Sequence, residues 1–586
     1  MNNISRLNTW NFGLCSSLFR FGKLPAGLGR VLLQLGLLMA PVAISSAALG
    51  AERIYIYYGP IEFSLPIAAL DTYAREGKIE QVLAAYTNYL TPEQLEQLRE
   101  VLVARVDVTP VAIAQFLYSP QGIIILERLS EVIQTKAGQP GFYAIRAALI
   151  KAAAHPEGLT ILNVLREFPT YGIRINSARG FAIIDDLSNL IRQSEMAIAV
   201  VQQQARAEAA AETEFSFAGQ PGVAFSLEQD LRQPGLIPYR MQTLRITDIR
   251  RNRTFLVDLY LPTPSNPLPG GGAGGAAPVI VISHGLGSDR QTFAYLARHL
   301  ASYGFAVAVP EHPGSNAVRI QALIDGLANE VTPPSEFINR PLDVKVLLDE
   351  LQRLFGNQLD LERVGVLGQS FGGYTALALA GANINFEQLQ KDCARLNDSL
   401  NLSLLLQCRA EELAITEDNL QDERVKGAIA INPVGSSLFG ETEFGNIKVP
   451  MMLIAGSDDT VAPALPEQIQ PFTWLTTPNK YLVLVENGTH FSVLEESSGS
   501  VPIPSAAIGP EPALAREYIQ ALSVAFFKTY IANNSEYRPY LSASYAEYLT
   551  QPPIPLSLVQ SLTLEQLSQS SEGEDSTPEP VPSPLP

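Results

Sequence analysis

Three residue types that together perform nucleophilic catalysis occur in the second half of the chain, each near the end of an apolar run. Ser370 stands in the segment Gly-Gln-Ser-Phe-Gly, and the only histidine after it is His490. Between them, Asp458 and Asp459 follow an apolar run that ends at Gly456. A serine hydroxyl is a weak nucleophile that needs a histidine base, which in turn needs an acid to orient it. The order serine, acid, histidine predicts such a triad, with one of the two aspartates as the acid.

The residues around Ser370 predict a tight turn between a strand and a helix. Residues 364–367 are typical of a buried strand, and a helix is expected from Tyr374 onward. Gly368 and Gly372 flank the serine, where side chains would collide with adjacent backbone. The first amides of the helix point at the same place and favour negative charge. Ser370 is therefore expected at the carboxyl end of a strand, facing a bound molecule.

Two backbone amides are candidates for holding the oxyanion that forms during such an attack. One belongs to Phe371, directly after the serine, and the other to Leu286 in the loop Ser-His-Gly-Leu-Gly-Ser. We expect His284 to orient this loop, with direct substrate contact as the alternative. His312 is expected to face the rim of the site, the sheet edge formed by the carboxyl ends of the strands. It has either a structural role or a substrate contact. His299 is expected to be an ordinary helix residue. No grouping of His, Cys, Asp and Glu has zinc-ligand spacing, so no metal is required.

The elements that must position these residues alternate along the chain. Apolar runs typical of buried strands are interleaved with amphipathic helical segments between residues 278 and 531. This alternation predicts an α/β fold with a mostly parallel sheet and helices on both faces. An antiparallel hairpin is expected at residues 239–262. The Gly-rich segment 267–278 is interpreted as a flexible surface connection, because no Gly-Lys-Ser/Thr follows it.

The 586 residues are enough for two or three domains. Residues 52–207 have apolar residues at helical spacing and predict a mainly α-helical domain, in which His155 is structural or solvated. The remaining parts follow in chain order: a linker (208–238), a catalytic α/β domain (239–532) with a lid insertion at about 382–424, and a C-terminal extension (533–586) whose last part is expected to be disordered.

Two segments are candidates for covering the site, residues 315–338 and the insertion at 382–424. The insertion contains the apolar residues 402–406, which either line an acyl site, touch a lipid surface or pack as ordinary core. Long segments of this kind often control access to a site.

Composition and the amino-terminal residues bear on partners and location. Forty-one basic and 59 acidic residues give a net charge of −18, a poor match for nucleic acid. A short apolar run at 31–44 follows basic residues and precedes small ones, which is typical of an export signal over residues 1–50. An uncleaved anchoring helix is the alternative. Export to the periplasm or the medium would permit a disulfide between Cys393 and Cys408, with two free thiols as the alternative.

Residues from about 240 to 532 resemble the α/β-hydrolase fold, and within it the platelet-activating-factor acetylhydrolase and dienelactone-hydrolase-like groups. The resemblance is carried by the stretches SHGLGSDRQTFAYLARHLASYGFAVAVPEHPGS, NRPLDVKVLLDEL, GVLGQSFGGYTAL, AGSDDTVAP and NGTHFS. A true dienelactone hydrolase would carry a cysteine nucleophile, so the serine favours an esterase. The helical segment is similar to an uncharacterised bacterial domain found ahead of such hydrolases.

The resemblance also implies roles for individual residues. It places the acid three residues after Gly456, which favours Asp459 over Asp458. The implied site comprises the triad Ser370, Asp459 and His490 and the oxyanion amides of Leu286 and Phe371. It also implies water as the acyl acceptor and no cofactor.

These inferences predict an exported serine hydrolase that cleaves carboxylic esters through an acyl-enzyme. The expected partner is a small-molecule or lipid ester, with transient contact to a membrane surface. A peptidase or amidase on the same triad is one alternative. A non-catalytic binding protein on the same scaffold is another, although that reading predicts a damaged triad, whereas all three members are present.

Overall fold

The computed structural model describes residues 50–58, 61–87, 90–217, 229–263, 275–414, 419–497 and 503–572. All but the last residue of the predicted export signal, most of the Gly-rich connection and the end of the chain lie outside these residues. Among the described residues, no helix combines the length and the apolar character that a membrane span requires.

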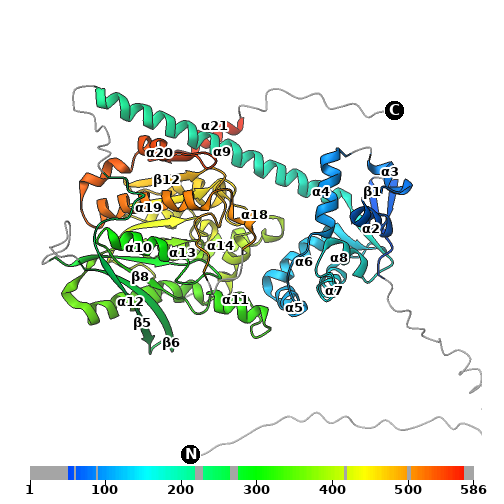
Figure 1. Ribbon diagram of the computed structural model, residues 1–586, viewed down its shortest axis with the longest axis horizontal. Helices are drawn as coiled ribbons and strands as arrows, with labels where there is room; N and C mark the ends of the chain where they lie inside the picture. The colour runs from blue at the N-terminus through cyan, green and yellow to red at the C-terminus, as the bar shows by residue number, and fades with distance from the viewer. Residues whose placement is uncertain are drawn as a thin grey trace, which may run out of the picture. The chain divides into compact units, whose positions relative to one another are not determined.

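A nine-stranded sheet forms the centre of residues 229–572, called the large domain, in the order β13-β12-β11-β10-β9-β7-β8-β6-β5. Figure 1 labels β5, β6, β8 and β12 of this sheet. The six strands from β12 to β8 are parallel, while β5, β6 and β13 run antiparallel to their neighbours. The strands are β5 (Tyr239–Asp248), β6 (Arg253–Pro262), β7 (Ala277–Ser283), β8 (Ala306–Pro310), β9 (Leu359–Gln369), β10 (Val425–Ile431), β11 (Met451–Gly456), β12 (Lys480–Val485) and β13 (Leu556–Val559). This arrangement confirms the predicted α/β fold class, including the hairpin of β5 and β6.

Helices cover both faces of this sheet, because alternate residues of its buried strands point to opposite sides. In β7, Ile280 and Ile282 pack with α10 and α19, whereas Val279 and Val281 pack with α12. The helices of the large domain are α10 (Ala294–Ser302), α11 (Ala317–Ile324), α12 (Glu336–Phe355), α13 (Phe371–Ala380), α14 (Phe386–Cys393), α15 (Leu404–Gln407), α16 (Ser436–Asn446), α17 (Gln470–Trp474), α18 (Ser505–Ile508), α19 (Pro512–Tyr530), α20 (Ala543–Leu549) and α21 (Leu564–Glu572).

The segment after residue 532, which the sequence indicated as an extension beyond the catalytic domain, is part of the large sheet. Strand β13 pairs with β12, with Val559 opposite Leu482. Its four residues are buried and complete the edge of the sheet. The strand was not recognised because four residues give too short a pattern to separate a strand from a loop.

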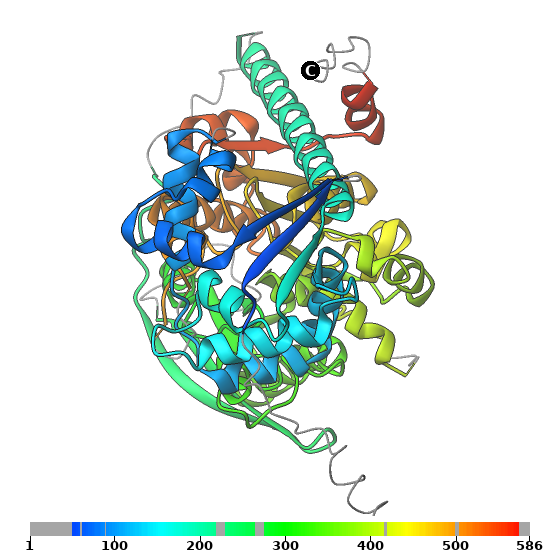
Figure 2. The same ribbon diagram turned by 90° about the vertical axis from the view of Figure 1, so that its right-hand side faces the viewer.

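Helix α9 (Ser177–Phe217) runs past residue 207 into the predicted linker and packs beside β13 and α20 (Figure 2). Val201 and Ala205 of this helix are buried in the core of the large domain. Glu208 accepts hydrogen bonds from the backbone N–H groups of Gln560 and Ser561, at 2.8 and 3.1 Å. The predicted end of the helical segment at residue 207 is therefore wrong by at least ten residues, because α9 continues to Phe217 where a linker was expected.

The N-terminal domain is rich in helix, but it also contains a four-stranded sheet that the sequence did not predict, in the order β2-β1-β4-β3. Strand β1 pairs in parallel with the distant β4, so this sheet depends on contacts between segments far apart in sequence. Its strands are β1 (Arg53–Tyr58), β2 (Ile61–Pro66), β3 (Ile133–Thr135) and β4 (Gly172–Asn176), and its helices are α2 (Ile67–Glu76), α3 (Gln81–Thr87), α4 (Pro92–Val103), α5 (Pro110–Tyr118), α6 (Pro120–Val132), α7 (Phe142–Ala153) and α8 (Ile161–Glu167).

His299, expected to be an ordinary helix residue, fastens the end of the linker to α10. Its Nε2–H donates to the carbonyl of Leu231 at 2.9 Å, and both residues are buried. Burial lowers the pKa of His299 to about 4. The imidazole is therefore neutral in the folded protein at neutral pH.

Acidification should lower the free energy of unfolding because of His299. Between pH 6.5 and 4 the unfolded chain binds a proton at this residue, whereas the folded chain does not, so stability present above pH 6.5 is lost as the pH falls. The loss amounts to roughly 3 kcal/mol at pH 4. The His299→Gln variant should show a shallower fall in the free energy of unfolding, measured by denaturant titration at several pH values. An unchanged slope in this variant would contradict the assignment.

Candidate active site

Ser370 occupies the turn between β9 and α13 in a strained backbone conformation, with φ 56° and ψ −119°. A methyl group at position 368 would lie 1.9 Å from the carbonyl oxygen of Gly372, and one at position 372 would lie 2.0 Å from that of Ser283. Only glycine fits at either position. The strand–turn–helix context expected from the sequence is therefore present around Ser370.

Of the two candidate acids, Asp459 is the one that meets the histidine. Its Oδ2 lies 2.7 Å from Nδ1 of His490, and both side chains are buried. Its Oδ1 accepts the backbone N–H groups of Val461 and Ala462 at 2.8 and 2.7 Å. Asp458 is exposed. Because the turn after β11 fixes both oxygens of Asp459, this carboxylate can hold the imidazole with Nε2 free for a second partner.

Ser370 and His490 are linked through Gln369. The side-chain amide of Gln369 donates to the carbonyl of His490 at 3.0 Å. In the part of the chain that the structure describes, no hydrogen bond joins Ser370 Oγ to the His490 ring directly. Catalytic hydrogen bonds are often long without substrate.

Asn432, at the end of β10, joins the loops that bear the acid and the base. Its Oδ1 accepts the backbone N–H of Gly456 at 3.0 Å, and its Nδ2 donates to the carbonyl of Thr489 at 3.2 Å. Its φ of 42° is in the left-handed region that asparagine tolerates. Neither Gln369 nor Asn432 was predicted as a site residue from the sequence. The available signal was that each amide stands at the carboxyl end of a strand beside the predicted site.

The loop after β7 passes directly over the nucleophile. A methyl group at Gly285 would lie 2.5 Å from Gln369 Oε1 and 3.5 Å from Ser370 Cβ. Among the described residues, neither the N–H of Leu286 nor that of Phe371 has a protein acceptor. Both N–H groups are therefore free donors, one in the residue after Ser370 and the other in the residue after Gly285, which packs against Ser370.

His284 and His312 are buried beneath this loop, and neither reaches the rim. His284 Nδ1 lies 2.8 Å from the carbonyl oxygen of Gly285, and its Nε2 accepts the backbone N–H of His312 at 3.0 Å. His312 contacts Ser283 Oγ and Asp343, each at 3.0 Å. Burial, and the arginine cations nearby, hold the pKa of both imidazoles well below 6.5. Both are structural, so the expectation that His312 faces the rim was wrong.

Leu286 and Phe491, the neighbour of His490, are part of the lining of a cavity of about 480 Å³. This volume is in the usual range for small-molecule sites. Its polar residues include Thr292 and Glu496. Its lining is mainly apolar and comprises Leu286, Ile320, Phe491, Leu494, Ile503, Pro504, Ala507 and Ile508.

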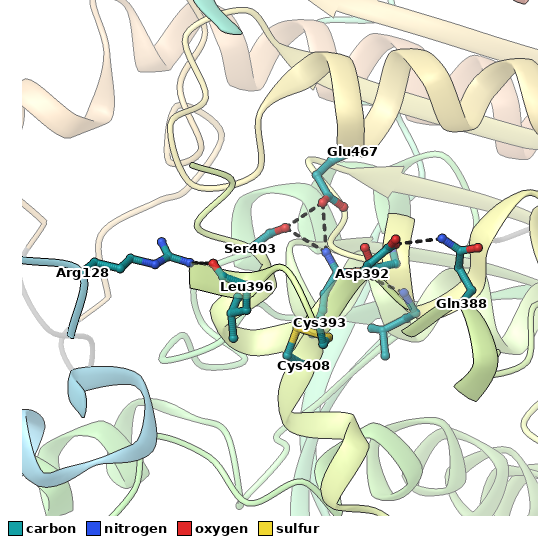
Figure 3. The surroundings of a disulfide bond; sticks show 11 residues. Arg128, Gln388, Asp392, Cys393, Leu396, Ser403, Cys408 and Glu467 are labelled. Carbon is teal, nitrogen blue, oxygen red and sulfur yellow. Dashed lines mark hydrogen bonds between the residues drawn. A yellow bond between two sulfur atoms is a disulfide. The ribbon is translucent and has the colours of Figure 1, made fainter. Parts of the chain in front are cut away.

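The described residues of the insertion at 382–424 do not line that cavity. They border a second cavity of about 750 Å³, with Asp392 and Arg395 in the lining. Cys393 and Cys408 are joined by a disulfide (Figure 3). Leu404 is buried and Leu406 packs against the same core, whereas Leu402 is exposed. The core alternative therefore holds for only part of residues 402–406. Instead Ile320, from the other candidate covering segment, borders the cavity beside Leu286.

Glu467 anchors the insertion to the rest of the large domain (Figure 3). This buried carboxylate accepts hydrogen bonds from Asn401 Nδ2 at 2.6 Å, Ser403 Oγ at 2.7 Å and Gln407 Nε2 at 2.9 Å. It also accepts the N–H groups of Gly435 and Ser436 at the start of α16, and the Ser436 hydroxyl. The carboxylate is thus balanced by donors and by a helix N-terminus.

Replacing Glu467 by Gln should loosen the insertion. An amide NH₂ cannot accept, so some of the buried donors would lose their partner, at a cost of about 2–4 kcal/mol. Limited proteolysis should then cut within residues 395–413. Glu441→Gln, a change at an exposed position of α16, is the matched control and should leave the insertion resistant. Equal resistance of both variants would rule out this role for Glu467.

The described residues show no cluster of three or more His, Cys, Asp and Glu side chains that could hold a metal ion. The chemistry available at this sheet edge is that of a serine, an imidazole held by a carboxylate, and free backbone N–H donors.

Two protein-family models match the chain. Residues 50–176 match the family described as "Alpha/beta hydrolase of unknown function (DUF1400)". Residues 241–342 match "Platelet-activating factor acetylhydrolase, isoform II". The large domain has the α/β-hydrolase fold, and the chain is similar to the platelet-activating-factor acetylhydrolases. The second match includes the loop at 283–288 but ends before Ser370.

Proposed function

We propose that this protein is a serine hydrolase that cleaves carboxylic esters with Ser370, His490 and Asp459 as its triad. The observation that carries the proposal is the 2.7 Å hydrogen bond between Asp459 and His490 at the sheet edge that also bears the strained Ser370 turn. The similarity to an acetylhydrolase family supports ester hydrolysis.

The proposed reaction begins when His490 Nε2 takes the Ser370 proton as Oγ bonds to the ester carbonyl carbon. The carbonyl oxygen becomes an oxyanion facing the N–H groups of Leu286 and Phe371. The C–O bond to the alcohol then breaks, and the imidazolium returns its proton to the departing alcohol. Water adds to the acyl-enzyme with His490 again as base, releasing the acid and restoring Ser370.

The cavity beside Leu286 supports an ester with an apolar chain as the substrate. Its mainly apolar lining offers burial to a hydrocarbon chain, worth ~0.8 kcal/mol per buried CH₂. We further propose that a lipid or short-acyl ester is used and that the protein acts outside the cytoplasm. The pattern of residues 1–50, which is typical of an export signal, and the Cys393–Cys408 disulfide support that location.

Replacing Ser370 by Ala should abolish hydrolysis of a short-chain nitrophenyl ester while the protein stays folded, because the variant lacks the Oγ that forms the acyl-enzyme. Labelling by a fluorophosphonate probe should be lost in the same variant. Asp459→Asn should lower kcat by about 10³–10⁴-fold, since the amide favours the wrong tautomer of His490.

Asp458→Asn is the matched control and should keep the parent rate, because this neighbouring carboxylate is exposed. Parental turnover by Ser370→Ala would refute the proposal. Selective cleavage of amides over esters would instead identify an amidase on the same triad.

Filling the cavity should change the chain length that the enzyme prefers. Ile320→Trp places a larger side chain in the lining, and we expect the kcat/KM ratio of octanoyl over acetyl nitrophenyl ester to fall by about tenfold. Val318→Trp is the control, because Val318 lies on the same helix and is 71% exposed. An equal change of the ratio in both variants would show that this cavity does not receive the chain.

A further inference from the structure

We propose that Arg340 is a positioning residue for the oxyanion hole. With His284, it fixes and polarises the peptide unit that ends in the Leu286 N–H. This inference rests on the proposed function, in which that N–H faces the developing oxyanion.

Arg340, on α12, reaches both halves of the proposed oxyanion hole. The residue is fully buried. Its Nη1 donates to the carbonyl of His284 at 2.7 Å, and its Nη2 donates to that of Gly285 at 3.3 Å. Its guanidinium carbon also lies 4.4 Å from the ring centroid of Phe371, whose N–H is the second donor. One side chain thus contacts the segments that present both amides.

The Gly285 carbonyl and the Leu286 N–H belong to one peptide unit. The unit is planar and trans, so the two groups point in opposite directions. The carbonyl oxygen has three neighbouring N–H donors: His284 Nδ1 at 2.8 Å, Arg340 Nη2 at 3.3 Å and the backbone of Ser288 at 3.3 Å. These donors hold the oxygen in place and therefore aim the N–H away from it. They also draw electron density toward the oxygen, which makes the N–H a stronger donor.

The charge of Arg340 is directed at the loop carbonyls. Within the described part of the chain, no carboxylate oxygen lies within 4.0 Å of its guanidinium nitrogens. Its Nε donates to Ser315 Oγ at 2.8 Å, and that hydroxyl donates to Glu336 at 3.1 Å. Glu336 itself is paired with Arg253 at 2.8 Å. Arg340 is thus not one half of a direct ion pair, as a purely structural buried arginine usually is.

Arg340 also keeps its charge at neutral pH. Burial lowers its pKa to about 9, which still leaves the guanidinium protonated. A buried cation next to the Gly285 carbonyl acts through few screening waters, so its influence on the neighbouring amide is strong.

The test compares Arg340→Met and Arg340→Lys with the parent on a short-chain nitrophenyl ester. The Met variant removes the positive charge and the N–H donors of the guanidinium. We expect kcat to fall by about 10–100-fold with KM nearly unchanged. The Lys variant keeps the charge but cannot reach both carbonyls and Ser315, so its kcat should be intermediate. The inhibition constant of phenylboronic acid, which forms a tetrahedral serine adduct, should rise in the same order.

Arg409→Met is the matched control, since Arg409 is similarly buried but pairs with Glu330 and Glu412 and, among the described residues, donates to no carbonyl of the loop at 283–288. It should keep the parental kcat and KM. Parental kcat in Arg340→Lys or Arg340→Met, or an equal loss in Arg409→Met, would overturn the inference while leaving the esterase proposal intact. If Arg340→Met does not fold, Arg340→Lys decides the question. A parent that hydrolyses no ester would overturn both.

Discussion

The close approach of backbone to backbone around Ser370 is the constraint on which the site depends. The carbonyl oxygens of Gly372 and Ser283 occupy the space that side chains at 368 and 372 would need. This packing holds Ser370 at a positive φ, a conformation that costs about 1–3 kcal/mol and persists only when its surroundings enforce it. The hydrogen bond from the Ser370 N–H to the Ile431 carbonyl, at 2.9 Å, secures the turn from the other side.

From this turn, a set of buried polar groups extends beneath the site. Gln369 and Asn432 tie together the loops after β9, β10, β11 and β12. His312, His284 and Arg340 support the loop after β7. Buried polar groups are costly when unpaired and rigid when fully paired. The hydrogen bonds that hold these groups therefore favour one arrangement of the loops, which suits groups that must meet with small tolerance.

Of the two segments that the sequence indicated as covers, residues 315–338 border the cavity beside Leu286, whereas the described part of the insertion at 382–424 does not. The long insertion is fastened by a disulfide and by Glu467, and several of its leucines, Leu404 among them, belong to the core. The cavity beside Leu286 is bordered instead by short segments around Ile320 and Ile508. A clamped insertion is a poor candidate for a moving lid, because each of its buried hydrogen bonds would have to break on opening.

The sequence determined the features that depend on local pattern. Alternating apolar runs and helices gave the sheet class, and the glycines around Ser370 gave the turn, because each is set by neighbours within a few residues. The chain also offered one histidine after the serine, which left a single candidate base.

Tertiary structure decided what depends on distant partners. Asp459 rather than Asp458 meets His490 because the turn after β11 fixes its carboxylate. Arg340 donates to a loop more than fifty positions away in the sequence. Strand β1 pairs with β4, which lies more than a hundred positions later in the chain. The four-residue β13 becomes a strand only because β12 offers an open edge. Such contacts leave no periodic trace in the sequence, since they are fixed by the packing of whole elements and not by the residues beside them.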